Sequence, residues 1–429
     1  MSRPALLLAL ALLAVTTPAA GEARVSRHVL PSGVRVLVRE DPAAGVVAVS
    51  LQARAGSRFE TPATAGITNF LQRSLLRGTT RRSGDALAEA VELLGGNLDA
   101  AGDVEYAEVR GSALARNWEP LLDLVAEVAL SPALAPAEIE KERRLVLGQI
   151  RTRGDNPFPQ SFDALMADLY GPHPYGLPSV GRRDVVERLS RDDLLAHHRA
   201  VYRADRLVLA VSGRVERDRV VRAAGRLLGG LARSERSGDD RPPQPAPTAA
   251  RRVLQRPASQ AQILVGFLGP AVGEPDYAAV KVLSAVLGGG MSGRLFVELR
   301  DRQGLAYSVG VLNPTRAGPA FILAYMGTAA ENAAAAEAGM ARELGRIAEE
   351  GIREDELARA KAYVLGTLAI DRRTNARHAW YLAFFEMVGA GWDFPERYAR
   401  AVEGVTAADV RAAARRYVRG ATTVVLEPR

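Results

Sequence analysis

The 429-residue sequence contains no cysteine. Disulfide scaffolds, thiol catalysis, iron–sulfur clusters and cysteine-type zinc sites are therefore excluded. Apolar residues make up 48% of the chain and charged residues 24%, values typical of a soluble globular protein and not of a disordered or fibrous one. At about 100–200 residues per domain, a chain of this length is expected to form two or three domains.

Lysine is scarce. It occurs only at Lys141, Lys281 and Lys361, so nearly all of the 56 basic residues are arginine. The net charge of +7 raises the question of nucleic-acid binding. The arginines are spread along the chain among aspartates and glutamates, however, and form no long basic run. We interpret the charge as an arginine-rich, solvated surface and expect no nucleic-acid partner.

The N-terminus lacks an apolar run long enough to span a membrane. Ala5–Val15 is an unbroken apolar run of 11 residues, whereas a spanning helix needs about 20. Arg3 precedes the run and small residues follow it between Ala19 and Ala23, the pattern of a secretory signal peptide. We therefore predict a signal peptide over 1–23, no stable membrane anchor, and a periplasmic or secreted location.

A polar, proline-rich segment, 233–250, is predicted to be a linker between two similar parts of the chain. Each part, 24–232 and 251–429, opens with two strand-like stretches and continues with helical and strand-like segments. The pattern predicts an α+β fold with two similar domains, each a mostly antiparallel sheet packed with helices.

The two parts also end alike. In each, a capped helix is followed by a tyrosine and a last strand. The helix starts at Ser190 with Asp193 three residues later, and at Thr406 with Asp409. Both pairs match the capping-box pattern, in which the two side chains satisfy the first backbone N–H groups of a helix.

A candidate functional helix lies at Gly66–Gly78. Apolar residues at helical spacing predict one buried stripe, formed by Ile67, Phe70, Leu71 and Leu75. Asn69, Gln72 and Arg73 share another face. The simplest interpretation of these three polar residues is a solvated helix surface.

The stretch 55–79 resembles the start of the pitrilysin/insulinase-type (mitochondrial-processing-peptidase-like) zinc metallopeptidases. In that family this helix carries His-x-x-Glu-His, whose histidines bind zinc and whose glutamate is the general base, and a later helix adds a glutamate ligand. The resemblance places Asn69, Gln72 and Arg73 at the three motif positions and Gln149 at the later ligand. Of the family's acids on these two helices, only Glu142 is retained.

None of these four side chains suits zinc hydrolysis. Amides are poor zinc ligands, a guanidinium repels a cation, and glutamine cannot accept a proton from water. We therefore predict no catalytic residue, no metal and no other cofactor in this chain. We also expect Arg73 to pair with Glu142 where the metal would otherwise lie.

The five histidines do not supply a replacement site. None has the spacing of metal ligands, and the adjacent pair on a predicted helix faces different ways. We interpret all five as ordinary structural or surface residues: His28, His173, His197, His198 and His378.

In the second part, Gly288–Val309 resembles another stretch of the same family. There, an arginine and a tyrosine reach across a cavity and bind substrate, and they match Arg300 and Tyr307. A guanidinium and a phenol can hydrogen-bond a peptide carbonyl and steady a developing oxyanion. The alternative is that Arg300 is an ordinary helix-surface residue and Tyr307 a core aromatic of a strand.

The resemblance implies a function for a chain of this kind. The family contains heterodimers in which one subunit carries zinc and a homologue without the metal motif supplies the Arg/Tyr pair and half of a clam-shell peptide chamber. We therefore expect a non-catalytic subunit that pairs with an active paralogue, whose zinc would cleave peptide substrates. The alternative is a peptide-binding or scaffold protein of the same fold, acting as a self-dimer with no peptidase role.

Overall fold

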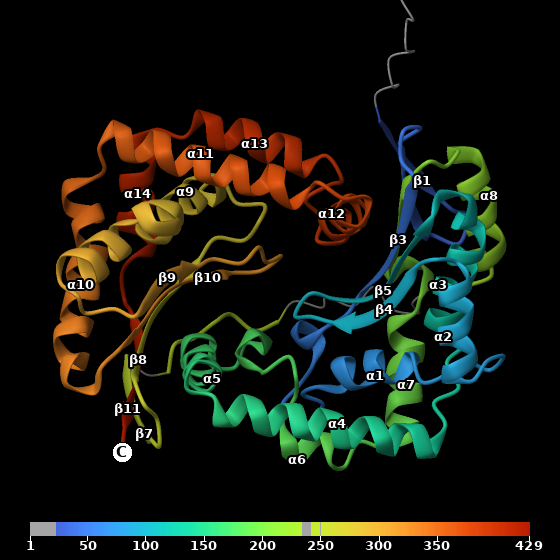
Figure 1. Cartoon of the computed structure of the whole chain (residues 1–429), viewed down its shortest axis with the longest axis horizontal. Helices are drawn as coiled ribbons and strands as arrows, with labels where there is room; N and C mark the ends of the chain where they lie inside the picture. The colour runs from blue at the N-terminus through green and yellow to red at the C-terminus, as the bar shows by residue number, and fades with distance from the viewer. Residues whose placement is uncertain (1–22, 234–241, 249) are drawn as a thin grey trace, which may run out of the picture.

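The computed structural model describes residues 23–233, 242–248 and 250–429 (Figure 1). The predicted signal peptide, 1–23, lies outside these residues except for Ala23, and so does about half of the predicted linker, 233–250. Within the described ranges, no helix is long and apolar enough to cross a membrane.

The first half of the chain builds a six-stranded sheet. Its strands are β1 (Arg24–Val29), β2 (Arg35–Glu40), β3 (Val46–Arg54), β4 (Asn97–Gly102), β5 (Tyr106–Leu114) and β6 (Leu207–Gly213). They lie in the order β1-β2-β6-β3-β5-β4. All neighbours are antiparallel except β2 and β6, which are parallel. Every residue of the central strand β6 is buried, because helices cover both faces of the sheet at that position.

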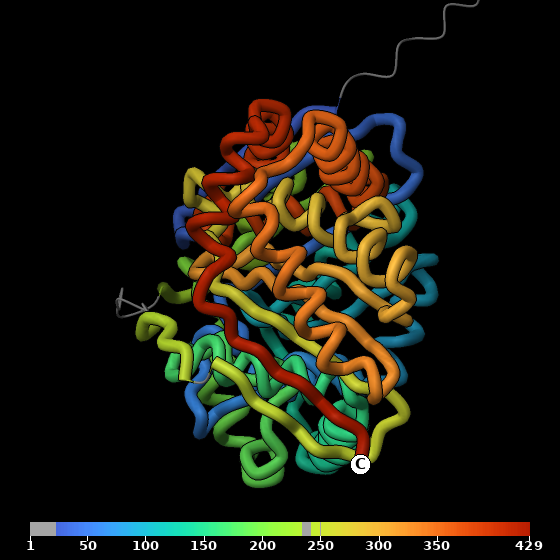
Figure 2. Tube along the Cα trace, turned by 90° about the vertical axis from the view of Figure 1, so that its left-hand side faces the viewer, coloured from blue at the N-terminus to red at the C-terminus, as the bar shows by residue number. Residues whose placement is uncertain are grey.

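The second half repeats this arrangement in five strands. They are β7 (Arg251–Arg256), β8 (Ala261–Gly269), β9 (Ser308–Leu312), β10 (Ala320–Thr328) and β11 (Thr422–Pro428). Figure 2 shows β11 running between β7 and β8, and the full order is β7-β11-β8-β10-β9. As in the first sheet, a single pair is parallel, here β7 and β11. Without β1, the two sheets have the same strand order, which confirms the predicted α+β fold of two similar, mostly antiparallel domains.

The described part of the chain contains fourteen α-helices. The first half contributes α1 (Ile67–Leu75), α2 (Gly84–Leu93), α3 (Trp118–Leu130), α4 (Pro136–Asp155), α5 (Pro157–Tyr170), α6 (Arg183–Val186), α7 (Arg191–Val201) and α8 (Arg217–Leu228). The second half contributes α9 (Tyr277–Gly288), α10 (Ala333–Glu350), α11 (Glu354–Asp371), α12 (Asn375–Met387), α13 (Phe394–Gly404) and α14 (Ala407–Tyr417). The predicted capping boxes are present at the starts of α7 and α14.

One helix of each half packs on the sheet of the other half. The second-half helix α12 lies against β3 and β6 (Figure 1). Its Leu382 and Phe384 share a buried cluster with Leu37 and Val208 of the first sheet. An ion pair between Arg27 and Glu386, 3.0 Å long, ties the same helix to β1.

The first-half helix α5 makes the reciprocal contact. It lies against β8 and β11, and its Leu165 and Leu169 are buried with Leu264 and Val424. In each half this helix is the third after the β-hairpin, so the exchanged helices are counterparts. The two halves therefore share their cores, and the linker is only one of several connections between them.

Candidate functional site

The start of α1 is fixed by a close backbone contact and a buried acid. Gly66 has φ +98°, and a Cβ at this position would lie 2.4 Å from the Cα of Gly181, so only glycine fits. The carboxylate of Glu60 accepts hydrogen bonds from the backbone N–H groups of Gly66 (2.7 Å) and Thr68 (3.0 Å). Burial raises the pKa of Glu60, while these two hydrogen bonds oppose that effect.

The predicted apolar stripe of α1 is buried, but its polar residues do not form one solvated face. Gln72 is fully buried. Its amide Nε2 and Oε1 lie 3.0 and 3.1 Å from the hydroxyl of Tyr202, which follows α7. The interpretation of Gln72 as a solvated residue is therefore wrong: its amide fills a polar gap between two helices, where burial without a partner would be costly.

Asn69 is half-buried beside the same helix start. Its Nδ2 donates a 3.3 Å hydrogen bond to the carbonyl oxygen of Val180. This bond ties α1 to the loop that contains Gly181. Asn69 is thus engaged in a structural contact at the position where the resemblance places the first zinc ligand.

The predicted pairing of Arg73 with Glu142 is present. The Nε of Arg73 lies 2.5 Å from Oε1 of Glu142, a buried carboxylate on α4. Arg77 binds the other oxygen, with its Nε 2.7 Å from Oε2 and its Nη2 in a further contact. One buried acid is therefore held by two arginines, Arg73 on α1 and Arg77 in the turn that follows this helix, and the three charges join this region to α4.

Zinc does not fit this set of side chains. An amide, a guanidinium and the exposed amide of Gln149 stand at the positions that the resemblance assigns to the zinc ligands. The nearby carboxylate of Glu142 is occupied by Arg73 and Arg77, whose positive charges would repel a divalent cation. In residues 23–233, 242–248 and 250–429, no group of three or more His, Asp or Glu is arranged to hold a metal ion.

The histidines take part in local contacts. On α7, His197 lies 3.0 Å from the hydroxyl of Thr68, and the adjacent His198 lies 2.8 Å from the carbonyl oxygen of Ala129, so the two do face different ways. His173 is buried, and its Nδ1 accepts a hydrogen bond from the backbone N–H of Tyr175 at 3.1 Å. Burial lowers the pKa of His197 to about 4, so this imidazole is neutral at neutral pH.

Arg300 and Tyr307 are both exposed. Arg300 lies in η6 (Phe296–Arg302), a π-helical turn, and its guanidinium is 4.7 Å from the centroid of the Phe296 ring. Tyr307 directly precedes β9 and is 75% exposed, so it is not a core aromatic. Neither side chain has a hydrogen bond or ion pair to another residue of the described chain. Arg300 is a helix-surface residue, and both side chains are free to meet a ligand.

Two family profiles match the chain in succession. Residues 35–182 match the insulinase (peptidase family M16) profile, and residues 188–364 match the peptidase M16 inactive domain. The chain belongs to the M16 family. The resemblance found in the sequence is thereby confirmed.

Relatives of similar length are named as zinc proteases. An uncharacterized zinc protease of Mycobacterium bovis is 33% identical over 397 residues, covering 91% of this chain and 90% of the relative. One from Streptomyces coelicolor is 30% identical over 408 residues, covering 92% and 87%. The solved peptidase M16 inactive domain from Pseudomonas fluorescens superimposes with a TM-score of 0.88 at 24% identity, over 95% of this chain and 98% of its own. At that identity the structural match establishes the shared fold.

Two residues of this M16 site were missed by sequence reasoning. Arg77 follows Arg73 by four residues, a spacing that places two side chains on one side of a helical segment and could have indicated a shared partner. Tyr202, the partner of Gln72, lies 130 residues further along the chain. No local pattern connects these two, and only the folded chain brings them together.

Proposed function

We propose that this M16-family chain is the non-catalytic, zinc-lacking subunit of a heterodimeric zinc metallopeptidase. The observation that carries the proposal is the ion cluster of Arg73, Glu142 and Arg77, which includes one of the positions that the resemblance assigns to a zinc ligand. The same chain keeps an exposed Arg300 and Tyr307 with no partner in its described part. The polar residues of α1 form structural contacts and cannot hold zinc, whereas Arg300 and Tyr307 can bind peptide. A chain with these properties is suited to assist an active paralogue.

In the proposed complex the paralogue supplies zinc and the general base. Arg300 and Tyr307 supply hydrogen-bond donors from this chain. Their guanidinium and hydroxyl groups bind the carbonyl oxygen of the peptide and stabilise the negative charge that develops on it. Exposure of both side chains supports this role, because neither has to break a hydrogen bond or an ion pair of the described chain before binding.

The sheet edges offer a way to hold an extended peptide in half of a shared chamber. β4 and β9 lie at the ends of the two sheets. A Cβ on Gly102, at the end of β4, would lie 3.2 Å from the backbone N of Asn69, so this edge passes close to α1. A peptide that adds to β4 as a further strand would run beside the altered metal position.

Co-purification tests the subunit assignment. The tagged chain, expressed in its native host, is expected to bring down a paralogue that contains His-x-x-Glu-His. Recovery of this chain alone as a self-dimer would instead support a peptide-binding scaffold. Zinc analysis is the second measurement: the lone chain is expected to hold no stoichiometric zinc and the mixed complex to hold one ion. Stoichiometric zinc in the lone chain would contradict the proposal.

We also propose that the protein is exported to the periplasm or secreted. The apolar run Ala5–Val15 and the small residues that follow it support this location. Cell fractionation and N-terminal sequencing of the mature chain test it. Export is expected to fail when residues 1–23 are deleted, and a full-length cytoplasmic chain in the native host would refute the assignment.

A further inference from the structure

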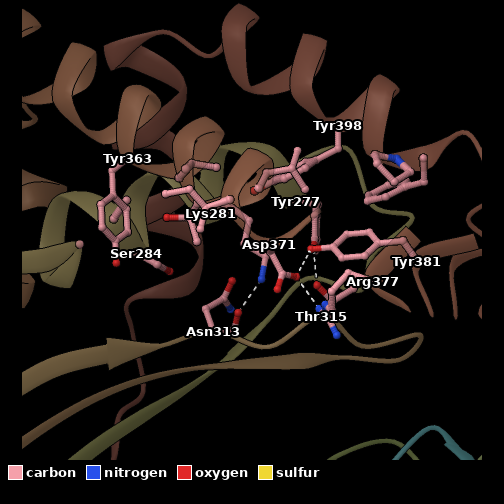
Figure 3. Close-up of a pocket in the computed structure, with 18 of the residues that line it drawn as sticks. Tyr277, Lys281, Ser284, Asn313, Thr315, Tyr363, Asp371, Arg377, Tyr381 and Tyr398 are labelled. Carbon is pink, nitrogen blue, oxygen red and sulfur yellow. Dashed lines mark hydrogen bonds and ion pairs between the residues drawn. The ribbon is translucent and has the colours of Figure 1, made fainter. Parts of the chain in front are cut away.

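A cavity of about 650 Å³ lies in the second half of the molecule (Figure 3). Helices α9, α11, α12 and α13 form one side of it, and β9 with the connection to β10 forms the other. Neither Arg300 nor Tyr307 lines the cavity, and it is separate from the ion cluster between α1 and α4. Its volume falls in the range of about 300–1,000 Å³ that small-molecule sites occupy.

The walls of this cavity are largely aromatic. Six rings line it: Tyr277, Tyr363, Tyr381, Phe385, Phe394 and Tyr398. Tyr363 is 47% exposed although it is a large side chain, so part of the aromatic wall is in contact with solvent. Such a wall is suited to enclosing a flat or branched apolar group.

Lys281, one of only three lysines in the chain, lies on α9 and lines this cavity. Its Nζ donates a 2.5 Å hydrogen bond to the carbonyl oxygen of Asn313 and lies 5.1 Å from the centroid of the Tyr277 ring. No carboxylate of the described chain forms an ion pair with it. An ammonium group that is withdrawn from water without an anionic partner is costly, and a bound anion would relieve that cost.

Among the described residues, the other charged groups of the cavity form an ion pair with each other, with one exception. Asp371 accepts hydrogen bonds from Tyr381 (2.7 Å) and from Arg377, and so does not neutralise Lys281. The hydroxyl of Tyr277 lies 2.6 Å from that of Thr315. The exception is Arg373, which is exposed and whose only described partner is a backbone carbonyl oxygen. The cavity therefore has two cations without a carboxylate partner.

Electrostatics around Lys281 agree with an anion-binding site. Burial and, to a smaller extent, the positive charge of Arg316 together lower the pKa of Lys281 to about 7. The charged and titratable groups around it are Asp371, Arg373, Arg377, Arg316, Tyr277, Tyr363, Tyr381 and Tyr398. An anion beside Nζ would favour the protonated form and raise this pKa.

We propose that this cavity binds a small carboxylate attached to an apolar or aromatic group. Lys281 pairs with the carboxylate, Arg373 adds positive charge, and the tyrosine and phenylalanine rings enclose the apolar part. The carboxylate belongs either to a free organic acid or to the C-terminus of a peptide, since both present the same group. This binding is a property of the single chain and does not depend on the proposed heterodimer.

Calorimetry with a matched pair of probes tests the proposal on the whole mature chain. The acid 3-phenylpropionate and its neutral amide have the same shape and differ in charge. A hydrogen-bonded charge pair predicts that the acid binds at least about tenfold more tightly than the amide. Lys281→Met is expected to abolish this preference while leaving binding of the amide unchanged.

The matched control is Lys361→Met, which removes a half-buried lysine outside the cavity whose Nζ donates a hydrogen bond to the carbonyl oxygen of Glu403. It is expected to keep the preference for the acid. Equal affinity for acid and amide in the wild type, or an unchanged preference in Lys281→Met, would overturn the proposal. Thermal melts of both variants establish that each is folded.

A spectroscopic readout follows from the scarcity of lysine. After reductive ¹³C-methylation, the three lysines give three resonances, and Lys281→Met identifies one of them. That resonance is expected to titrate near pH 7 and to move to a higher pKa when 3-phenylpropionate is added. A resonance that does not respond to saturating acid would contradict the assigned contact.

The source of the carboxylate is resolved with a peptide that ends in phenylalanine, used with a free and with an amidated C-terminus. Tight binding of the free form only, lost in Lys281→Met, identifies chain ends as ligands. Binding of 3-phenylpropionate without binding of either peptide identifies a small organic acid. Tighter binding of phenyl phosphate than of 3-phenylpropionate would overturn the assignment to a carboxylate.

Discussion

At the scale of single residues, Glu142 holds together the ion cluster that it forms with Arg73 and Arg77. Replacing it by glutamine leaves Arg73 and Arg77 facing an amide that can accept only part of their hydrogen bonds. Removal of one partner from a buried ion pair costs up to about 5 kcal/mol, but these arginines stay 35% and 38% exposed, so we expect Glu142→Gln to lower the free energy of unfolding by about 2 kcal/mol. Urea denaturation measures this change.

The matched control is Glu138→Gln on the same helix. Glu138 pairs with Lys141 at the surface, where an ion pair is worth about 0–1 kcal/mol. Equal losses of stability in the two variants would show that the cluster of Arg73, Glu142 and Arg77 contributes no more to the free energy of unfolding than a surface ion pair does.

The sequence predicted part of this site for a definite physical reason. Arg73 and Glu142 could be paired because the family resemblance already placed their helices together and opposite charges attract. The burial of Gln72 could not be foreseen, because it depends on Tyr202, a distant residue whose hydroxyl reaches the same gap. The types of these side chains were enough to exclude zinc binding and general-base catalysis. Their hydrogen bonds and burial became visible only in the folded chain.

The second prediction at this scale concerns Arg300 and Tyr307 in the proposed complex with an active paralogue. Arg300→Ala and Tyr307→Phe are each expected to lower kcat/KM of the complex by about 10²-fold, the effect of losing one oxyanion donor. Because both side chains are exposed, the free energy of unfolding should change by less than about 0.5 kcal/mol. Peptide hydrolysis by the reconstituted pair measures the effect, and unchanged turnover would remove both residues from the site.

At the scale of elements, helices α5 and α12 bind the two halves together. Phe384 of α12 is buried against the first sheet. Its ring stacks on that of Trp380, with 4.6 Å between the ring centroids, and meets the ring of Tyr106 edge-on, with 5.9 Å between the centroids. Phe384→Ala would leave a cavity in that shared core and is expected to cost about 3–5 kcal/mol. Unfolding followed by fluorescence and circular dichroism should remain a single transition at a lower midpoint.

The control for Phe384→Ala is Leu93→Ala at the end of α2, where the side chain is 79% exposed and the expected change is within about 0.5 kcal/mol. Separate transitions for the two halves would contradict the shared core.

Prediction of elements from the sequence succeeded where the determinants are local. The capping boxes at Ser190 and Thr406 each depend on a side chain three residues away, so they were readable in the sequence. The parallel pairing of β2 with β6, and the packing of α12 on β3, join segments separated by most of a domain or more. Their partners are chosen by burial of apolar faces in the folded chain, for which no short pattern exists.

At the scale of the whole molecule, the repeated topology allows the two halves to be compared position by position. Helices α1 and α4 of the first half correspond to α9 and α11 of the second, because each pair follows the equivalent strand and hairpin. In the first half this helix pair is joined by the charges of Arg73, Glu142 and Arg77. In the second it borders the cavity that contains Lys281. The same pair of helices is thus joined by an ion cluster in the first half and borders a cavity in the second.

The junction between the halves also makes the stability of the whole molecule sensitive to acid. His173 and Tyr175 lie beside Glu105, whose carboxylate accepts a 2.9 Å hydrogen bond from the backbone N–H of Ala317 in the second half. Burial, followed by the positive charge of Arg58, lowers the pKa of His173 to about 4, although the charge of Glu105 opposes this shift. Protonation would also disrupt the hydrogen bond that Nδ1 accepts from Tyr175.

A histidine with a pKa below its ordinary value favours the folded state above about pH 6.5, and this contribution is lost as the pH falls towards 4. We therefore compare the wild type with His173→Asn, whose Oδ1 can accept the same backbone hydrogen bond without titrating. Between pH 6.5 and 4, the free energy of unfolding should fall by as much as about 3 kcal/mol more in the wild type than in this variant.

The wild type must be compared with the variant because buried Glu60 and Glu108 have raised pKa values. Their protonation favours the folded state as the pH falls, which opposes the effect of His173. Their contribution cancels in the difference between wild type and His173→Asn. His28→Asn, which changes an exposed histidine on β1, should follow the wild-type profile. The free energy of unfolding is measured by urea denaturation at each pH. Parallel pH profiles for the wild type and His173→Asn would show that protonation of His173 does not contribute to the loss of stability in acid.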